Sequence, residues 1–164
     1  MGRSNWQNLK HTPTNKEPDF GYRGIVDDEY ALLPDFLEPA KENVSQLQVK
    51  FSYSDSILTC TLSWRLSSAD RPPYLVSSLY TEFAVSDKAF KAGLNEEGSE
   101  LRFELSTLIQ IATITVGALR GFVYAKLKNS SIQASLPLVN MEDLMKDHDN
   151  TFYLNSSKEE EALS

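Results

Sequence analysis

The 164-residue sequence contains one cysteine, two histidines and no cluster of basic residues. The single cysteine, Cys60, excludes an intrachain disulfide, so the fold does not depend on an oxidising compartment. The formal charge is −7, and without clustered Lys and Arg the chain lacks the surface that neutralises nucleic-acid phosphates. We therefore expect no nucleic-acid partner.

An apolar leader and an unbroken membrane span are also missing from the sequence. Residues 1–18 are polar and lack the apolar core of a signal peptide, so export is not expected. Polar residues interrupt the longest apolar segment, Leu101 to Leu127, at Thr107, Gln110, Thr113 and Thr115. That segment falls short of an unbroken membrane span, and we predict a soluble cytoplasmic protein.

The sequence contains no recognisable catalytic, phosphate-binding or metal-binding motif. It has no Gly-rich phosphate loop, no Gly-x-Ser-x-Gly elbow and no EF-hand spacing. His148 lies between two aspartates, but no second His or Cys cluster completes a metal site, and His11 belongs to a polar segment. Cys60 alternates with leucines, which indicates a core thiol rather than a nucleophile. We expect no enzyme activity, no metal and no cofactor.

The apolar content is sufficient for one folded domain. Hydrophobic residues make up 41% of the chain and aromatic residues 10%, enough to bury a core at this length. Residues 1–18 show no apolar period and are predicted to be a flexible arm. Residues 151–164 end in SSKEEEALS and are predicted to be an acidic flexible tail. The folded domain is thus expected to span residues 19–150.

Period-two alternation predicts several strands in this domain. The mixed stretch from Phe20 to Leu37 is assigned to one irregular strand. Leu47 to Tyr53 and Leu58 to Leu66 alternate regularly, and the turn residues Ser54 to Ser56 between them predict a hairpin. Tyr74 to Val85 is apolar on both faces, so its second face is expected to meet a helix, a partner subunit or a ligand.

A long helix is predicted from Leu101 to Leu127, with Ser99 as its N-cap and Glu100 and Glu104 in its first turns. The segment is apolar on more than one face, which indicates burial between two surfaces. Its β-branched centre favours a strand by propensity, but the run is long and contains no Gly or Pro until Gly117.

A short amphipathic helix is predicted after Asn140. Its apolar stripe consists of Met141, Leu144 and Met145, opposite charged residues. Such a stripe either closes a core or lines a groove. Methionine suits a groove because its flexible thioether adapts to varied partners.

In this order the elements resemble the SecB family of protein-export chaperones, including the SecB-like chaperones of toxin–antitoxin systems. The matching segments are YTEFAV, IATITVGALRGFVYAKL and LPLVNMEDLM, and the resemblance covers about Gly21 to His148. It implies an α+β fold with a four-stranded antiparallel sheet, one long helix and one short C-terminal helix. It also implies a homo-oligomer, a dimer of dimers assembled through the long helices.

The resemblance further implies an ATP-independent chaperone that binds unfolded polypeptides, either preproteins or an antitoxin, in a hydrophobic groove between the sheet and the short helix. By position, the groove residues on the helix are Met141, Leu144 and Met145, and those on the sheet are Tyr74, Val76 and Tyr80. The family's export members present acidic sheet residues to the Sec translocation motor. Here Glu82 is the only acid in its strand, and Met141 replaces the family's Phe, so chaperoning is implied more strongly than export.

The alternative is a dedicated binding module for a single protein partner or a small apolar ligand, without general chaperone activity. The range of captured clients distinguishes the two functions.

Overall fold

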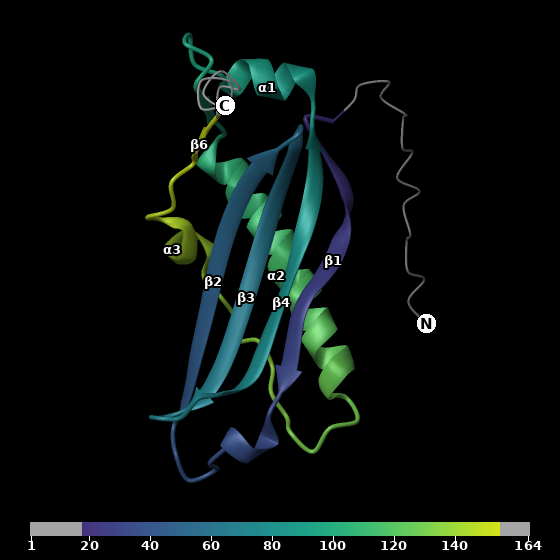
Figure 1. The fold of residues 1–164 in the computed structure, drawn as a ribbon, viewed down its shortest axis with the longest axis vertical. Coiled ribbons are helices and arrows are strands. Elements are labelled where there is room, and N and C mark those ends of the chain that lie inside the picture. The colour runs from purple at the N-terminus through teal and green to yellow at the C-terminus, as the bar shows by residue number, and fades with distance from the viewer. Residues whose placement is uncertain (1–17, 155–164) are drawn as a thin grey trace, which may run out of the picture.

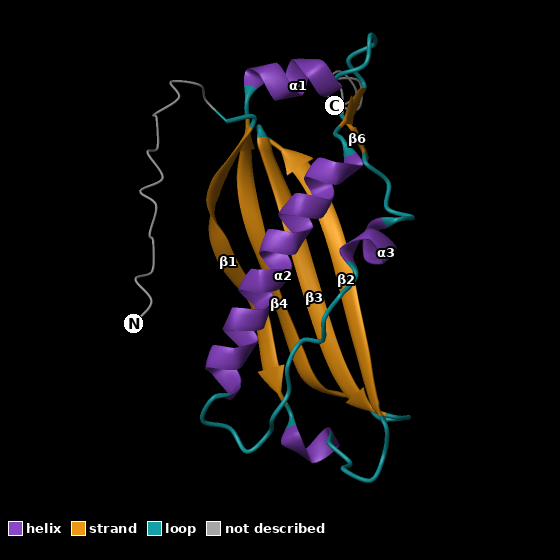
Figure 2. Cartoon of the chain, turned by 180° about the vertical axis from the view of Figure 1, so that it is seen from behind, coloured by secondary structure: helices purple, strands orange, loops and turns teal. Residues whose placement is uncertain are grey.

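Four antiparallel strands form a sheet in the order β1-β4-β3-β2 in the computed structural model, which describes residues 18–154 (Figure 1). The strands are β1 (Phe20–Leu32), β2 (Asn43–Ser54), β3 (Ile57–Ser68) and β4 (Pro73–Val85). The long helix α2 (Leu105–Leu127) crosses one face of the sheet diagonally (Figure 2). An α+β fold with a four-stranded antiparallel sheet and a long helix is thereby confirmed. The predicted arm, apart from Pro18, and residues 155–164 of the predicted tail lie outside the described residues.

The irregular first strand and the hairpin agree with the sequence patterns. The pairing of β1 with β4 shifts register between Tyr22 and Gly24 and again between Asp27 and Glu29. Each shift changes the face to which the following side chains point, which explains the mixed alternation of this segment. A 3-10 turn, η1 (Pro34–Phe36), then leads toward β2.

The β2–β3 hairpin pairs without any register shift from Asn43 opposite Ser68 to Ser54 opposite Ile57. Its turn residues Asp55 and Ser56 have φ values of 51° and 65°. Positive φ at both positions is typical of a type I′ turn, whose twist matches that of the two strands.

The predicted start of the long helix is wrong, because residues before Leu105 form a strand. β5 (Glu100–Arg102) pairs with β6 (Thr151–Tyr153) in a small two-stranded ribbon. Ser99 is therefore not an N-cap, and its carbonyl oxygen accepts a hydrogen bond from the Leu154 backbone N–H. The first three residues assigned to the tail form β6. This pairing joins distant parts of the chain, so no local pattern reveals it.

One further helix, α1 (Asp87–Gly93), was not predicted. Ser86 caps it, because its hydroxyl accepts a hydrogen bond from the Ala89 backbone N–H. The helix ends at Gly93, where a Cβ would collide with the carbonyl oxygen of Arg102. Glycine thus permits the close approach of α1 to β5.

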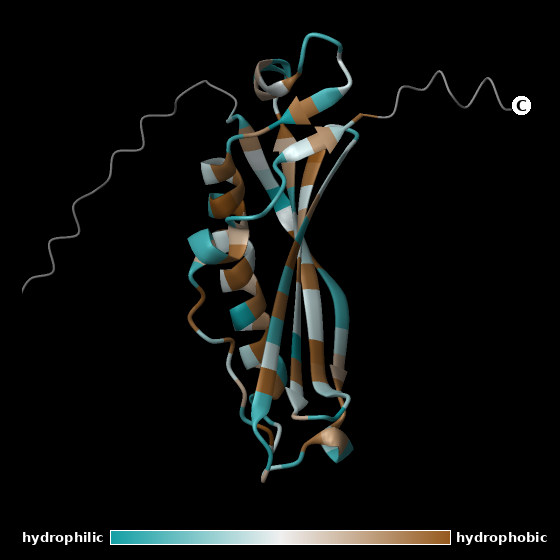
Figure 3. Ribbon diagram, turned by 90° about the vertical axis from the view of Figure 1, so that its left-hand side faces the viewer, coloured by the Kyte–Doolittle hydropathy of each residue, from teal (hydrophilic) through white to brown (hydrophobic). Residues whose placement is uncertain are grey.

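We call the sheet face beneath α2 the inner face and the opposite one the outer face. The inner-face side chains Leu58, Cys60, Leu62 and Trp64 of β3 are all 0% exposed. The Trp64 indole N–H donates a 2.8 Å hydrogen bond to the Ser45 hydroxyl oxygen, which satisfies its buried donor. Figure 3 shows α2 and α3 on the same side of the sheet, with no helix lying along its other face in the part of the chain that the structure describes.

The buried face of α2 packs directly on the sheet. Its buried residues are Leu108, Ile111, Ala112, Thr115, Val116, Leu119, Val123 and Leu127. By length and composition alone, α2 would also suit a membrane span, a test that the core helix of a soluble protein passes as well. In the structure, its buried face packs on the sheet, as that of a core helix does.

The short helix α3 (Met141–Met145) forms as predicted. The Asn140 side-chain oxygen accepts hydrogen bonds from the backbone N–H groups of Glu142 and Asp143, which caps the helix. Between α2 and α3 the chain crosses the inner face without regular secondary structure, and its buried residues Ile132 and Leu136 join the core.

Candidate functional site

Two of the six predicted groove residues, Tyr74 and Met145, are buried in the core. Met145 is 0% exposed and belongs to the apolar cluster that contains Leu58 and Phe83. Tyr74 is 3% exposed, and its hydroxyl donates a 3.2 Å hydrogen bond to Oδ1 of Asn43. Burial raises the pKa of the Tyr74 hydroxyl above its usual value. Both side chains belong to the core rather than to a ligand-binding surface.

Val76 and Tyr80 lie on the outer face of β4. Tyr80 stands between its cross-strand neighbours Val26 of β1 and Thr61 of β3. Alternating residues of the same strand, such as Thr81, point inward, and the Thr81 hydroxyl is hydrogen-bonded to Thr115 of α2. Val76 and Tyr80 are both partly exposed and therefore available to a ligand.

Met141 and Leu144 lie on the opposite side of the molecule, on α3. This helix contacts α2 and covers the inner face, since Met141 packs against both core clusters. Both residues are partly exposed. The thickness of the sheet therefore separates the two sets of predicted residues, and they do not share one groove. The period-two pattern of β4 identified two faces correctly, but a strand pattern does not say which face a later helix covers.

The structure instead brings α3 beside the edge of β2 (Figure 1). The ring of His148, just after α3, meets the ring of Phe51 edge-on, with 5.3 Å between centroids. The inward residues of β2 next to this helix are partly exposed. We call this surface the β2–α3 strip, and it comprises Leu47, Val49, Phe51, Met141 and Leu144.

The helix side of the β2–α3 strip, Met141 and Leu144, was predicted from the sequence, whereas its strand side was not. The signal was present in NVSQLQVKFSYS, the sequence of β2, which contains one charged residue and neither Pro nor Gly. That composition does not protect a sheet edge. Only the topology shows that β2 is an edge strand.

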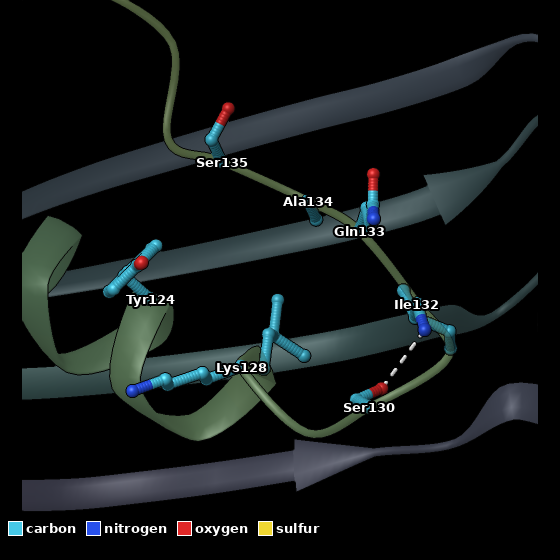
Figure 4. Close-up of a pocket in the computed structure, with 8 residues that line it drawn as sticks. Tyr124, Lys128, Ser130, Ile132, Gln133, Ala134 and Ser135 are labelled. Carbon is cyan, nitrogen blue, oxygen red and sulfur yellow. Dashed lines mark hydrogen bonds between the residues drawn. The ribbon is translucent and has the colours of Figure 1, made fainter.

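A separate cavity of about 420 Å³ lies where the end of α2 and the following chain segment diverge (Figure 4). Its lining residues are Tyr124, Leu127, Lys128, Ser130, Ile132, Gln133, Ala134 and Ser135. The Ser130 hydroxyl oxygen accepts a hydrogen bond from the Ile132 backbone N–H, which shapes the turn at its base. This cavity contains none of the residues predicted from the sequence.

Cys60 and the candidate metal ligands named from the sequence lie outside these surfaces or form no cluster within residues 18–154. Cys60 is buried, and burial raises the pKa of its thiol to about 11, so the reactive thiolate is disfavoured. Among the described residues, no three His, Cys, Asp or Glu side chains gather as a metal site. His11 lies outside the described residues.

Comparison with protein-family models found no match, and a search of curated proteins found no significantly similar sequence.

Proposed function

We propose that this protein is an ATP-independent chaperone that holds extended segments of unfolded polypeptides along the β2–α3 strip. The observation that carries the proposal is an unprotected sheet edge beside the partly exposed apolar stripe of the amphipathic helix α3. The resemblance to the SecB family supports the same function. A cytoplasmic location is part of this proposal.

The two edge strands of the sheet differ in their protection. β1 has two register shifts, and the second lies in its acidic stretch Asp27–Glu29. Bulges and charges are common devices against unwanted strand pairing. β2 has neither a shift nor a charge other than Lys50. Among the described residues, β3 is its only strand neighbour. β2 is therefore the edge that suits an added strand.

The hairpin geometry identifies the free backbone groups of β2. A type I′ turn closes on a hydrogen-bonded pair, here Ser54 and Ile57, and such pairs alternate with non-bonded pairs along an antiparallel ladder. The odd-numbered residues of β2, including Val49 and Phe51, thus direct their N–H and C=O groups outward. An added strand would pair with these groups in any sequence.

The side chains of an added strand would alternate between the two faces of the sheet. Those on the inner side would lie against α3, where Met141 and Leu144 are partly exposed. Backbone pairing would supply binding without sequence specificity, and the apolar stripe of α3 would favour apolar clients. This combination is what a general chaperone requires.

Exposed apolar residues on α2 and on β1 support assembly into a homo-oligomer, which we propose to be a dimer of dimers through α2. Tyr22 is 57% exposed, Ile25 46% and Ile114 50%. Gly117 and Gly121 lie on the exposed side of α2, with nothing within 4 Å of the position of an added Cβ. Small residues of this kind allow a second helix to approach closely. Light scattering of the full chain should give the mass of an oligomer.

Unfolded preproteins and antitoxins both present suitable client segments. The Sec translocation motor is the less favoured partner, because the outer face is not uniformly acidic. Lys50 and Arg65 lie on the outer face together with Glu82.

A proline substitution in β2 tests the function and the strip together. Val49→Pro removes one outward N–H and should weaken suppression of client aggregation at least about 10-fold, the effect of about 1.4 kcal/mol. Val49→Ala loses similar packing but keeps the N–H, and should suppress aggregation nearly as well as the wild type. Circular dichroism checks that both variants are folded.

Each contrary outcome has a distinct meaning. If Val49→Pro suppresses client aggregation as well as the wild type does, the β2 edge is not the binding site. If the wild-type protein does not suppress the aggregation of any denatured client, the proposed chaperone function itself is overturned.

A further inference from the structure

The C-terminal half of α2 and the segment after it form a region without acidic residues. No Asp or Glu occurs between Glu104 and Glu142, although the whole chain has a formal charge of −7. The only charged residues in this interval are Arg120, Lys126 and Lys128. This interval thus carries three positive charges and no negative one in an otherwise acidic chain, and its cations attract acidic groups.

The cavity at the end of α2 lies within this cationic region. Lys128 is its only charged lining residue. Tyr124, which is 70% exposed, stands at one side of the opening, and Ile132 and Ala134 lie across from it (Figure 4). Buried Leu127 contributes to its apolar lining. The cavity therefore combines apolar contacts with one positive charge.

The segment that forms the far wall offers an open backbone. Burial alternates along it, with Ile132 and Leu136 buried and Gln133 and Ser135 exposed. Within residues 18–154, no backbone–backbone hydrogen bond involves residues 133–139. The Arg120 guanidinium donates a 3.2 Å hydrogen bond to the Pro137 carbonyl oxygen and fixes the segment to α2. Such a wall suits an extended peptide that pairs through its own backbone.

The chain itself contains a segment of matching chemistry. Residues 155–164 read NSSKEEEALS, with three consecutive acids, Glu159 to Glu161, followed by Ala162 and Leu163. This segment follows β6, which lies at the N-terminal end of α2 (Figure 2). We propose that residues 155–164 dock along α2 as an internal ligand, with Ala162 and Leu163 in the cavity and the three acids near the cationic side chains.

The available length is sufficient for this docking within one chain. Tyr124 is 19 residues after Leu105, or about 29 Å along the helix axis. Leu163 is nine residues after Leu154, and an extended chain of that length covers about 30 Å. On the same scale Glu161 reaches about 23 Å and lies level with Arg120, at about 22 Å. Along the extended segment, Glu161 thus reaches Arg120, and Leu163 then reaches the cavity beside Tyr124.

Paramagnetic relaxation in the full-length protein tests the proposal. Ala162→Cys is labelled with a nitroxide, while Cys60 is buried and protected from the reagent. We expect loss of the amide signals of Tyr124 and of residues 130–135, while those of the distant β2–β3 turn at Asp55 persist. At about 1 M salt, where the Debye length falls to about 3 Å, the lost signals should return.

Charge variants provide the matched controls. Replacing Glu159, Glu160 and Glu161 with Gln should restore the signals, and Lys128→Glu should do the same. Combining Lys128→Glu with lysines at positions 159–161 should again broaden them. Full signal intensity around the cavity in the labelled wild type would overturn the proposal. Broadening that is insensitive to all of these charge changes would overturn the charge match on which it depends.

Discussion

The inner and outer faces of the sheet share one backbone but have different surroundings. On β3, Leu62 is 0% exposed beneath α2, while its neighbour Thr61 points to the uncovered side. On α3, buried Met145 and partly exposed Leu144 repeat the contrast within one turn of helix. Adjacent residues of similar type therefore have different roles. A residue that another layer covers stabilises the fold, and a residue that is left uncovered is available for surface recognition.

Introducing a carboxylate into α3 should give the largest difference in stability between two adjacent positions. Met145→Asp places a charge in a fully buried site and should lower the free energy of unfolding by at least about 4 kcal/mol. Leu144→Asp, at a partly exposed site, should change it by less than about 1 kcal/mol. Urea unfolding followed by circular dichroism measures both. Similar losses at the two positions would show that α3 does not dock as described.

Truncations on β3 should show the same contrast with a smaller amplitude. Leu62→Ala leaves a cavity under α2 and should cost about 3 kcal/mol. Thr61→Ala on the outer face should cost less than about 1 kcal/mol. Thermal unfolding of the two variants provides the measurement. An equal cost would mean that the outer face is covered as thoroughly as the inner one.

Because the thiol of Cys60 is buried on the inner face, the free energy of unfolding should depend on pH in the alkaline range. Burial raises the pKa of Cys60 from 9.0 to about 11, so the unfolded chain loses this proton at lower pH than the folded one. The contribution of the neutral thiol is complete below about pH 9 and is lost as the pH rises towards 11. The difference of about two pKa units corresponds to about 2–3 kcal/mol.

Cys60→Ala is the control for this pH dependence. Burial also raises the pKa values of Tyr74, which is buried, and of Tyr30, which is partly buried, and their contribution remains in the variant. The unfolding free energy of Cys60→Ala should fall less steeply between pH 9 and 11 than that of the wild type. Parallel curves would contradict the burial of the thiol.

Removal of a side-chain hydrogen bond on each face should give the smallest difference in stability. The Thr81 and Thr115 hydroxyl oxygens lie 2.7 Å apart in the core. Thr115→Val leaves the Thr81 hydroxyl without that partner and should cost about 1–2 kcal/mol. On the outer face, Ser78 donates a 3.1 Å hydrogen bond to exposed Asp28. Ser78→Ala should cost less than about 1 kcal/mol, because water can replace the lost donor.

A double variant separates the lost bond from the unpaired group. Thr81→Val combined with Thr115→Val removes both hydroxyls and should recover most of the stability lost by Thr115→Val alone. Denaturant unfolding of the single and double variants measures the coupling. Strictly additive losses would show that the two hydroxyls do not interact.

Short-range patterns carried most of the fold information. The alternation from Leu58 to Leu66, the turn at Asp55 and the short helix after Asn140 each depend on neighbouring residues, and each appears in the structure as predicted. These local patterns predicted only part of the candidate site. Met141 and Leu144 are partly exposed as a groove requires, whereas Met145 and Tyr74 are buried, although all four lie in apolar patterns.

The sequence by itself determined the four strands of the main sheet, the hairpin and the two predicted helices apart from the start of α2, because periodicity acts within a few residues. Tertiary structure alone decided that β5 pairs with β6, that α3 covers the inner face and that β2 forms an edge. These features join segments far apart in the chain, and their energy comes from mutual burial rather than from local preference. The surface available to another polypeptide is defined by that long-range packing.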